Sequence, residues 1–146
     1  CWQKGVDAMV QAQVRWNGKM GFVGVSGSNH AVVMDVRKEN GGDGTAPSPM
    51  ELVLMALAGC SGVDVAQIVK KKRLKVRDFQ VFVEGERAEE HPRVFTRVQL
   101  TFVFAGEDLT RKPLEDAVRL SLEKYCSVAG MVGKTAEIDW QVQIKE

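Results

Sequence analysis

Hydrophobic and polar residues alternate near the start of the chain. Residues 10–16 read V-Q-A-Q-V-R-W, the alternation recurs twice before residue 35, and Asn17-Gly18 is a typical hairpin dipeptide. This pattern predicts a three-stranded antiparallel meander over residues 10–35. The Gly-rich segment 40–48 that follows has the composition of a loop.

A long, predominantly apolar segment comes next, over residues 49–72. Ser48 followed by a proline is a typical helix start, because the hydroxyl caps the helix and proline suits the first helical position. The predicted helix is apolar on nearly every side, so it has to be enclosed all round. Glu51 and Asp64 lie within it and argue against a membrane span, because carboxylates are costly inside a bilayer.

The second half of the chain alternates between strand-like and helix-like periodicity. We expect a hairpin of two strands, an amphipathic helix, a short helix and a closing strand, over residues 76–86, 93–105, 109–126, 127–133 and 136–144. The resulting order, β-β-β-α-β-β-α-α-β, predicts the α+β fold class.

The chain has 146 residues, which is enough for one domain with one core. We expect residues 9–146 to form that domain, and residues 1–8 to be an expression remnant or a disordered N-terminus. One sheet of such a chain can cover only one side of the long helix. The other side is therefore predicted to meet a second copy, giving a homodimer.

The composition limits which binding partners and which cellular location we expect for this protein. Twenty Lys and Arg residues against nineteen Asp and Glu residues give a net charge of +1, which excludes the cationic surface typical of nucleic-acid binding. We expect neither a nucleic-acid nor a membrane partner. The chain shows no secretory signal, so a cytoplasmic location is expected. Three cysteines without a C-x-x-C pair predict no disulfide scaffold, no metal and no cofactor.

Two of the three cysteines lie in apolar sequence, at Cys60 and Cys126. Cys60 is flanked by Gly59 and Ser61, small residues that let a substrate or another backbone approach. A buried cysteine that packs as a small hydrophobe explains the same pattern. The sulfur of Cys126 is expected near the N-terminus of the short helix that begins at Ser127, which favours the thiolate.

A charged residue near Cys60 affects its chemistry. Asp64 lies one helical turn further on, so its carboxylate would raise the thiol pKa unless a basic residue neutralises it. Arg15, Arg93 and Arg97 lie on predicted strands and are the candidates for that role. The residues alone leave redox and structural interpretations open.

Three segments resemble the OsmC/Ohr family of thiol-dependent hydroperoxide reductases. They are A-P-S-P-M-E-L at 46–52, A-G-C at 58–60 and E-K-Y-C-S-V at 123–128, and the resemblance extends over most of the chain. It implies an OsmC-like fold, an intertwined homodimer whose long central helices are buried. It also implies that Cys60 is the peroxidatic thiol and Cys126 the resolving thiol, which condense to a disulfide that an external thiol reduces.

The implied substrate is a small apolar organic hydroperoxide, and the implied role is oxidative-stress defence. Met50 stands where the family has its activating glutamate, and Glu51 matches the next position. Arg15 is the candidate activator of the thiolate. This pattern is closer to the OsmC-like branch of redox proteins. The residues expected to bind substrate are all apolar, namely Met50, Leu57, Val63, Phe102 and Met131.

Two alternatives to catalysis remain at this point. The first is a non-catalytic dimer of the same fold that binds an apolar ligand or senses the redox state. The second is a structural dimer in which both thiols are inert packing groups.

Overall fold

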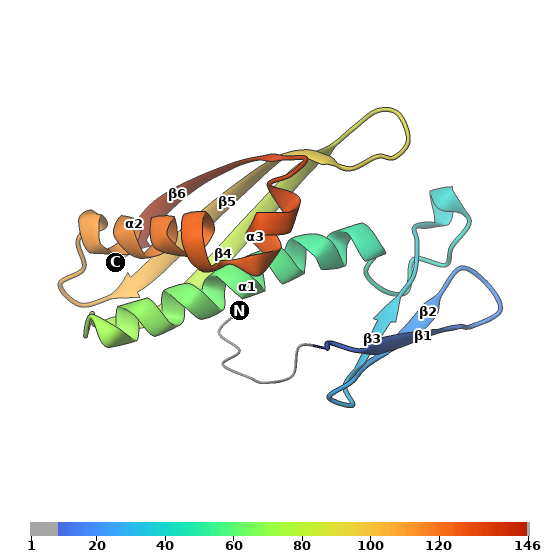
Figure 1. Cartoon of the computed structure of the whole chain (residues 1–146), viewed down its shortest axis with the longest axis horizontal. Helices are drawn as coiled ribbons and strands as arrows, with labels where there is room; N and C mark the ends of the chain where they lie inside the picture. Colours follow the sequence, from blue (N-terminus) through green and yellow to red (C-terminus); the bar gives the residue numbers. More distant parts are fainter. Residues whose placement is uncertain (1–8, 146) are drawn as a thin grey trace. The chain divides into compact units, whose positions relative to one another are not determined.

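The computed structural model describes residues 9–145. The segment 1–8, predicted to be a remnant or disordered, lies outside the described residues. The described chain divides into two compact units, residues 9–53 and residues 54–145, which Figure 1 shows together. The prediction of one domain over 9–146 stays a prediction. The α+β class and the predicted order of elements are confirmed.

The first unit contains a three-stranded antiparallel sheet. Its strands are β1 (Ala12–Trp16), β2 (Phe22–Ser26) and β3 (Ala31–Met34), in the order β1-β2-β3. The Asn17 side chain organises the first turn, because its Oδ1 accepts hydrogen bonds from the backbone N–H groups of Lys19 and Gly21 at 2.8 and 3.2 Å. The predicted meander is therefore confirmed. A loop with a short 3₁₀ turn, η1 (Lys38–Asn40), leads to the long helix.

The long helix α1 (Pro49–Lys71) begins in the first unit and continues into the second. Its start is a capping box. The Ser48 N–H donates to Glu51 Oε1 at 3.0 Å, and the Glu51 N–H donates to Ser48 Oγ at 3.2 Å. These reciprocal bonds satisfy donors that the first helical turn leaves without partners, so the predicted N-terminus of the helix is confirmed.

The second unit is built on a mixed sheet of longer strands. Strand β5 (Phe95–Gly106) lies between β4 (Val76–Arg87), which is antiparallel to it, and β6 (Glu137–Lys145), which is parallel. Alternate residues of β5 are fully buried, namely Val98, Leu100, Phe102 and Phe104. Figure 1 shows α1 and α2 (Arg111–Leu120) on the same face of this sheet, which is where the core forms.

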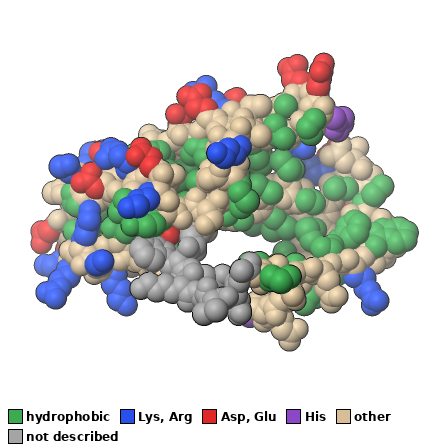
Figure 2. All heavy atoms as spheres, viewed as in Figure 1, with side chains coloured by type: hydrophobic (Ala, Val, Ile, Leu, Met, Phe, Trp, Pro, Cys, Tyr) green, Lys and Arg blue, Asp and Glu red, His purple; other side chains and the backbone are tan. Residues whose placement is uncertain are grey.

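The predicted helix 109–126 ends earlier than expected. Helix α2 stops at Leu120, and a π-helical turn, η2 (Ser121–Tyr125), leads into α3 (Ser127–Val132). The outer surface of α2 carries three ion pairs, Arg111–Glu115, Lys112–Asp116 and Arg119–Asp116, where Figure 2 shows positive and negative side chains side by side. Charges of α2 are thus compensated locally.

Helix α1 has two contrasting faces within this chain. One face is buried and carries Leu57, Ser61, Asp64, Val65, Ile68 and Val69. The opposite face is exposed although it is apolar, and it carries Met55, Ala56, Gly59, Val63 and Ala66. We call these five residues the open face of α1. By length and composition alone α1 could cross a membrane. Its buried face packs inside its own unit, however, as in a core helix.

Candidate thiol site

Cys60 lies at the border between the two faces of α1. The residue is partly buried, and on a regular helix it is offset from Asp64 by about 40° around the axis. Beside it, a Cβ atom added to Gly59 or Gly62 would meet no heavy atom within 4 Å. Because none of residues 9–145 fills that space, these residues leave room for another backbone or a slim ligand beside Cys60. Cys60 is not a free thiol in this structure.

Cys126 is positioned by the π-helical turn. Its backbone N–H donates to the carbonyl oxygen of Ser121 at 2.7 Å, five residues back, which closes the wider turn. The same residue is the N-cap of α3, and its Sγ accepts a hydrogen bond from the Ala129 N–H at 3.4 Å. Cys126 is a buried free thiol, so the two cysteines are not bridged to each other in this structure.

A buried polar cluster joins the elements that carry the two cysteines. Ser121 Oγ donates to Asp64 Oδ2 at 2.8 Å and lies 3.1 Å from Ser61 Oγ. All three residues are completely buried. Ser61 follows Cys60 directly, and Ser121 holds the N–H of Cys126. The cluster therefore fixes the π turn against α1 close to both thiols.

The environment of Cys126 opposes ionisation. Burial raises the pKa of the Cys126 thiol, and the negative charge of Asp64 raises it further. The hydrogen bond from the Ala129 N–H lowers this pKa, with an effect smaller than that of burial but larger than that of the Asp64 charge. The predicted position at the start of a helix is thus confirmed, whereas the predicted preference for the thiolate is wrong because desolvation outweighs the helix terminus.

The candidate activating residues all belong to the first unit. Arg15 is exposed on β1. Glu51 is exposed and committed to Ser48, whose backbone N–H and hydroxyl lower the pKa of the Glu51 carboxyl. On a regular helix Glu51 faces away from Cys60, and Met50 is partly buried in the first turn. The roles predicted for these residues stay predictions.

The apolar residues predicted to bind substrate fall into two groups. Leu57 and Phe102 are fully buried in the core of the second unit. Val63 on the open face and Met131 on α3 are exposed, with 45% and 66% of their surface accessible. Of these four, Val63 and Met131 are the accessible pair in the described chain, while the fifth predicted residue, Met50, is partly buried. The binding role of all five stays a prediction.

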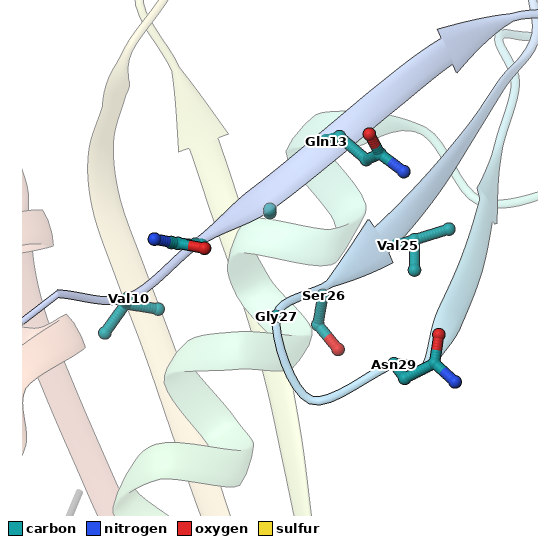
Figure 3. Close-up of a pocket in the computed structure, with 8 residues that line it drawn as sticks. Val10, Gln13, Val25, Ser26, Gly27 and Asn29 are labelled. Carbon is teal, nitrogen blue, oxygen red and sulfur yellow. The ribbon is translucent and has the colours of Figure 1, made fainter. Parts of the chain in front are cut away.

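The first unit also has a hollow of its own, drawn in Figure 3. It has a volume of about 640 Å³, and the described residues that line it come from β1, β2 and the turn after β2. They include Val10, Gln13 and Asn29, but no cysteine and no charged residue. Among residues 9–145, no three His, Cys, Asp or Glu side chains gather as a metal site.

Sequence reasoning missed the two serines of the buried cluster. Asp64 attracted notice as a carboxylate in an apolar helix, but its partner Ser121 lies 57 positions away. One signal was present in the sequence. Ser121 follows Leu114, Ala117 and Val118 at helical spacing, so it lies on the buried stripe of α2, where a polar residue needs a partner.

Comparisons with known proteins agree with this architecture. A family model described as OsmC-like protein matches residues 42–141. Protein YhfA of Escherichia coli K12 is 46% identical over 135 residues, covering 92% of this chain and 98% of YhfA. An OsmC-like protein from Mycoplasma pneumoniae is similar in structure, with a TM-score of 0.82 at 12% identity over 96% of this chain and 99% of the other. An organic hydroperoxide resistance protein from Elizabethkingia anophelis is also similar in structure, with a TM-score of 0.74 at 14% identity. This match covers 94% of this chain and 96% of the other. The last two show the shared fold.

Proposed function

Because the chain belongs to the OsmC-like family, we propose that it is a thiol-dependent hydroperoxide reductase that uses Cys60 and Cys126. One observation carries the proposal. The elements that hold the two cysteines are joined by the buried contact between Ser121 and Asp64 at 2.8 Å. The name of the structural relative from Elizabethkingia anophelis supports the same chemistry. The proposed setting is oxidative-stress defence in the cytoplasm.

The reaction begins with reduced Cys60. Cys60 first loses its proton, and its thiolate attacks the O–O bond of an organic hydroperoxide and takes the terminal hydroxyl group, so that Cys60 becomes a sulfenic acid. The alkoxide that leaves takes up a proton, which replaces the one Cys60 released, and departs as the alcohol. The Cys126 thiol then displaces the hydroxyl group from Cys60, which forms a disulfide and releases water. An external thiol, consumed in two equivalents, reduces the disulfide and restores both cysteines.

The two thiols differ in a way that fits these roles. The raised pKa of Cys126 keeps it protonated and slow toward peroxide, because the thiolate is the reactive form. Cys60 lies at the border of the open face of α1, beside two glycines whose surroundings residues 9–145 leave unfilled. A substrate can reach that position more readily than the buried Sγ of Cys126.

A homodimer belongs to the proposal. The open face of α1 leaves apolar surface uncovered, and the sheet of the first unit does so as well. Its exposed apolar residues include Val14, Trp16, Val23 and Val33, with 40 to 61% of their surface accessible. Exposed apolar surface of this kind on each unit marks an interaction site. A second copy that covers it would also enclose Cys60 and give Val63 and Met131 a place beside the substrate.

Peroxide consumption by reduced protein tests the chemistry. We would place all variants in a Cys1→Ser background, which leaves Cys60 and Cys126 as the two cysteines. Stopped-flow kinetics with cumene hydroperoxide should show one equivalent consumed per chain. Cys60→Ser should lose at least about 100-fold in rate, whereas Cys126→Ser should accumulate a sulfenic acid that dimedone traps. A Cys60→Ser variant as fast as its parent would disprove the assignment.

The activator and the assembly need separate tests. Arg15→Ala should slow the peroxide step, whereas Arg77→Ala, at an exposed position of β4, should not. Multi-angle light scattering should give twice the mass of 16.1 kDa. A stable folded monomer that reduces peroxide at the wild-type rate would remove the dimer from the proposal.

A second candidate function is a ligand-binding or redox-sensing dimer without turnover. Glu51 favours it, because the carboxylate nearest to the family's activating position is engaged in the capping box. The Cys60 thiol would then titrate well above neutral pH, and no disulfide between Cys60 and Cys126 would form with peroxide. Thiol alkylation as a function of pH, followed by peptide mass spectrometry, distinguishes the two functions.

A further inference from the structure

Asp64 is a fully buried carboxylate whose two oxygens differ. Oδ2 accepts the hydrogen bond from Ser121, at 2.8 Å. Oδ1 is also buried and has no hydrogen-bond partner among the residues that the structure describes. Leaving a buried charged oxygen without a partner is costly, on the order of 1–3 kcal/mol or more. Such an oxygen in a native structure calls for an explanation beyond packing.

The residue that carries the unpartnered oxygen is linked to the elements of both cysteines. Asp64 follows Cys60 by one turn of α1, so their side chains are neighbours on the helix. Ser121 donates its hydroxyl hydrogen to Asp64 and accepts the N–H of Cys126 on its carbonyl oxygen. The charge of Asp64 also acts on the Cys126 thiol, whose pKa it raises. A single carboxylate is thus coupled to both thiols.

The second step of the proposed reaction, the attack of Cys126 on Cys60, requires a base. Cys126 must attack as a thiolate, but burial and the charge of Asp64 raise its pKa and keep it protonated. A base is therefore needed at the moment of attack. The described residues that Cys126 contacts through hydrogen bonds are Ser121, Val128, Ala129 and Gly130, and all four use backbone groups for these bonds. None of these backbone groups can take up the thiol proton.

We propose that Asp64 accepts the proton of the Cys126 thiol through its free Oδ1 as Cys126 attacks the Cys60 sulfenic acid. The inference rests on the proposed function, since it concerns the second step of that reaction. The proton then passes to the hydroxyl that leaves Cys60, so that water departs and Asp64 is again ionised. The balance is one sulfenic acid plus one thiol giving one disulfide plus one water. Ser121 acts as a positioning residue, because it holds the other carboxylate oxygen.

Asp64→Asn gives a test in which two explanations predict opposite signs. If Asp64 is the proton acceptor, the variant should form the disulfide about 100-fold more slowly near neutral pH, which is the lower end of general-base effects. If Asp64 is only a nearby negative charge, its removal lowers the Cys126 pKa and the disulfide should form faster. Reduced protein in the Cys1→Ser background would be mixed with cumene hydroperoxide, and both steps followed by dimedone quenching and mass spectrometry.

Readouts besides the rate separate a chemical role from a structural one. Formation of the sulfenic acid on Cys60 should not be slowed in Asp64→Asn, and its conversion to the disulfide should recover as the pH rises, because hydroxide then ionises Cys126. Ser121→Ala keeps the carboxylate but releases it, so we expect slowing of about 10-fold at the same step. This variant also provides the test if Asp64→Asn does not fold. Asp116→Asn on the surface of α2 is the matched control and should behave as the parent.

The outcomes distinguish the inference from the function on which it rests. The inference alone is overturned if the parent forms the sulfenic acid and Asp64→Asn converts it to the disulfide at the parental rate or faster. A parent that forms no sulfenic acid on Cys60 overturns both. If Asp64→Asn forms the disulfide slowly at every pH, Asp64 has a structural role, and this result would also contradict the inference.

Discussion

The two faces of α1 differ in what they contact, although their residues alternate along one helix. The buried face packs Leu57, Val65 and Ile68 into the core of the second unit and holds Asp64 against Ser121. The open face is just as apolar but exposes its residues, with Met55 50% and Val63 45% accessible. Hydrophobicity alone therefore does not tell which residues of such a helix stabilise one chain.

The residue composition of each face of α1 indicates its structural role. The buried face combines large side chains with the one polar cluster that fixes the π turn. The open face is made of small or slender residues, and added Cβ atoms at Gly59 and Gly62 would meet nothing within 4 Å. Small residues in exposed helical positions weaken the helix by about 0.5–1 kcal/mol for each glycine. The glycines are explained if the backbone of another chain approaches α1 at these positions.

The largest expected effect is on folding, through the buried face. Leu57→Ala removes a completely buried side chain, so the free energy of unfolding should fall by about 2–5 kcal/mol. Met55→Ala, two residues away on the open face, is the matched control. It should change the unfolding of the single chain by less than about 1 kcal/mol, because half of its surface is accessible.

Urea denaturation at low protein concentration, where a dimer dissociates, measures this difference. Equal losses for Leu57→Ala and Met55→Ala under these conditions would mean that the two faces are equally buried in the folded chain. The contrast between the faces would then not hold in solution.

The next effect is on assembly, through the open face. Val63→Asp introduces a charge at a position that we propose is covered by a second copy, where it would be desolvated without a partner. We expect the dimer dissociation constant to increase about 100-fold, which corresponds to about 2.7 kcal/mol. Analytical ultracentrifugation over a range of concentrations measures it.

Val63→Ala is the control at the same position, because it keeps the surface apolar. It should weaken the dimer far less than the aspartate does. If Val63→Asp sediments as a dimer with unchanged affinity, the open face does not form the contact between copies.

The buried face and the elements around it were largely predictable from the sequence, whereas the site was not. Alternation and helical spacing are local signals, and they correctly predicted α1 and the strands. The π turn at Ser121–Tyr125 was missed, because apolar spacing continues through it and carries no information on a wider turn. The contact between Asp64 and Ser121 was missed because it joins residues that only the tertiary fold brings together. The raised pKa of Cys126 depends on burial, which local sequence does not reveal.

The smallest effect concerns the start of α1, where both faces begin. Ser48→Ala removes the hydroxyl that accepts the Glu51 N–H, so it should lower the free energy of unfolding by about 1 kcal/mol at neutral pH.

The backbone N–H and the hydroxyl of Ser48 lower the pKa of the Glu51 carboxyl in the folded chain. A carboxyl with a lowered pKa stabilises the fold above its unfolded pKa, and that contribution is lost as the pH falls through its folded pKa. Glu51→Gln should therefore be less stable than wild type at pH 7, and the difference should shrink as the pH falls below the ordinary glutamate pKa of about 4.3 and through the lowered pKa of the folded state. Thermal unfolding at pH 7 and over a series of decreasing acidic pH values, with Glu39→Gln as the control, measures this. If the difference between Glu51→Gln and wild type persists at low pH, the capping box does not depend on the charge of Glu51, and that carboxylate could serve the thiol site instead.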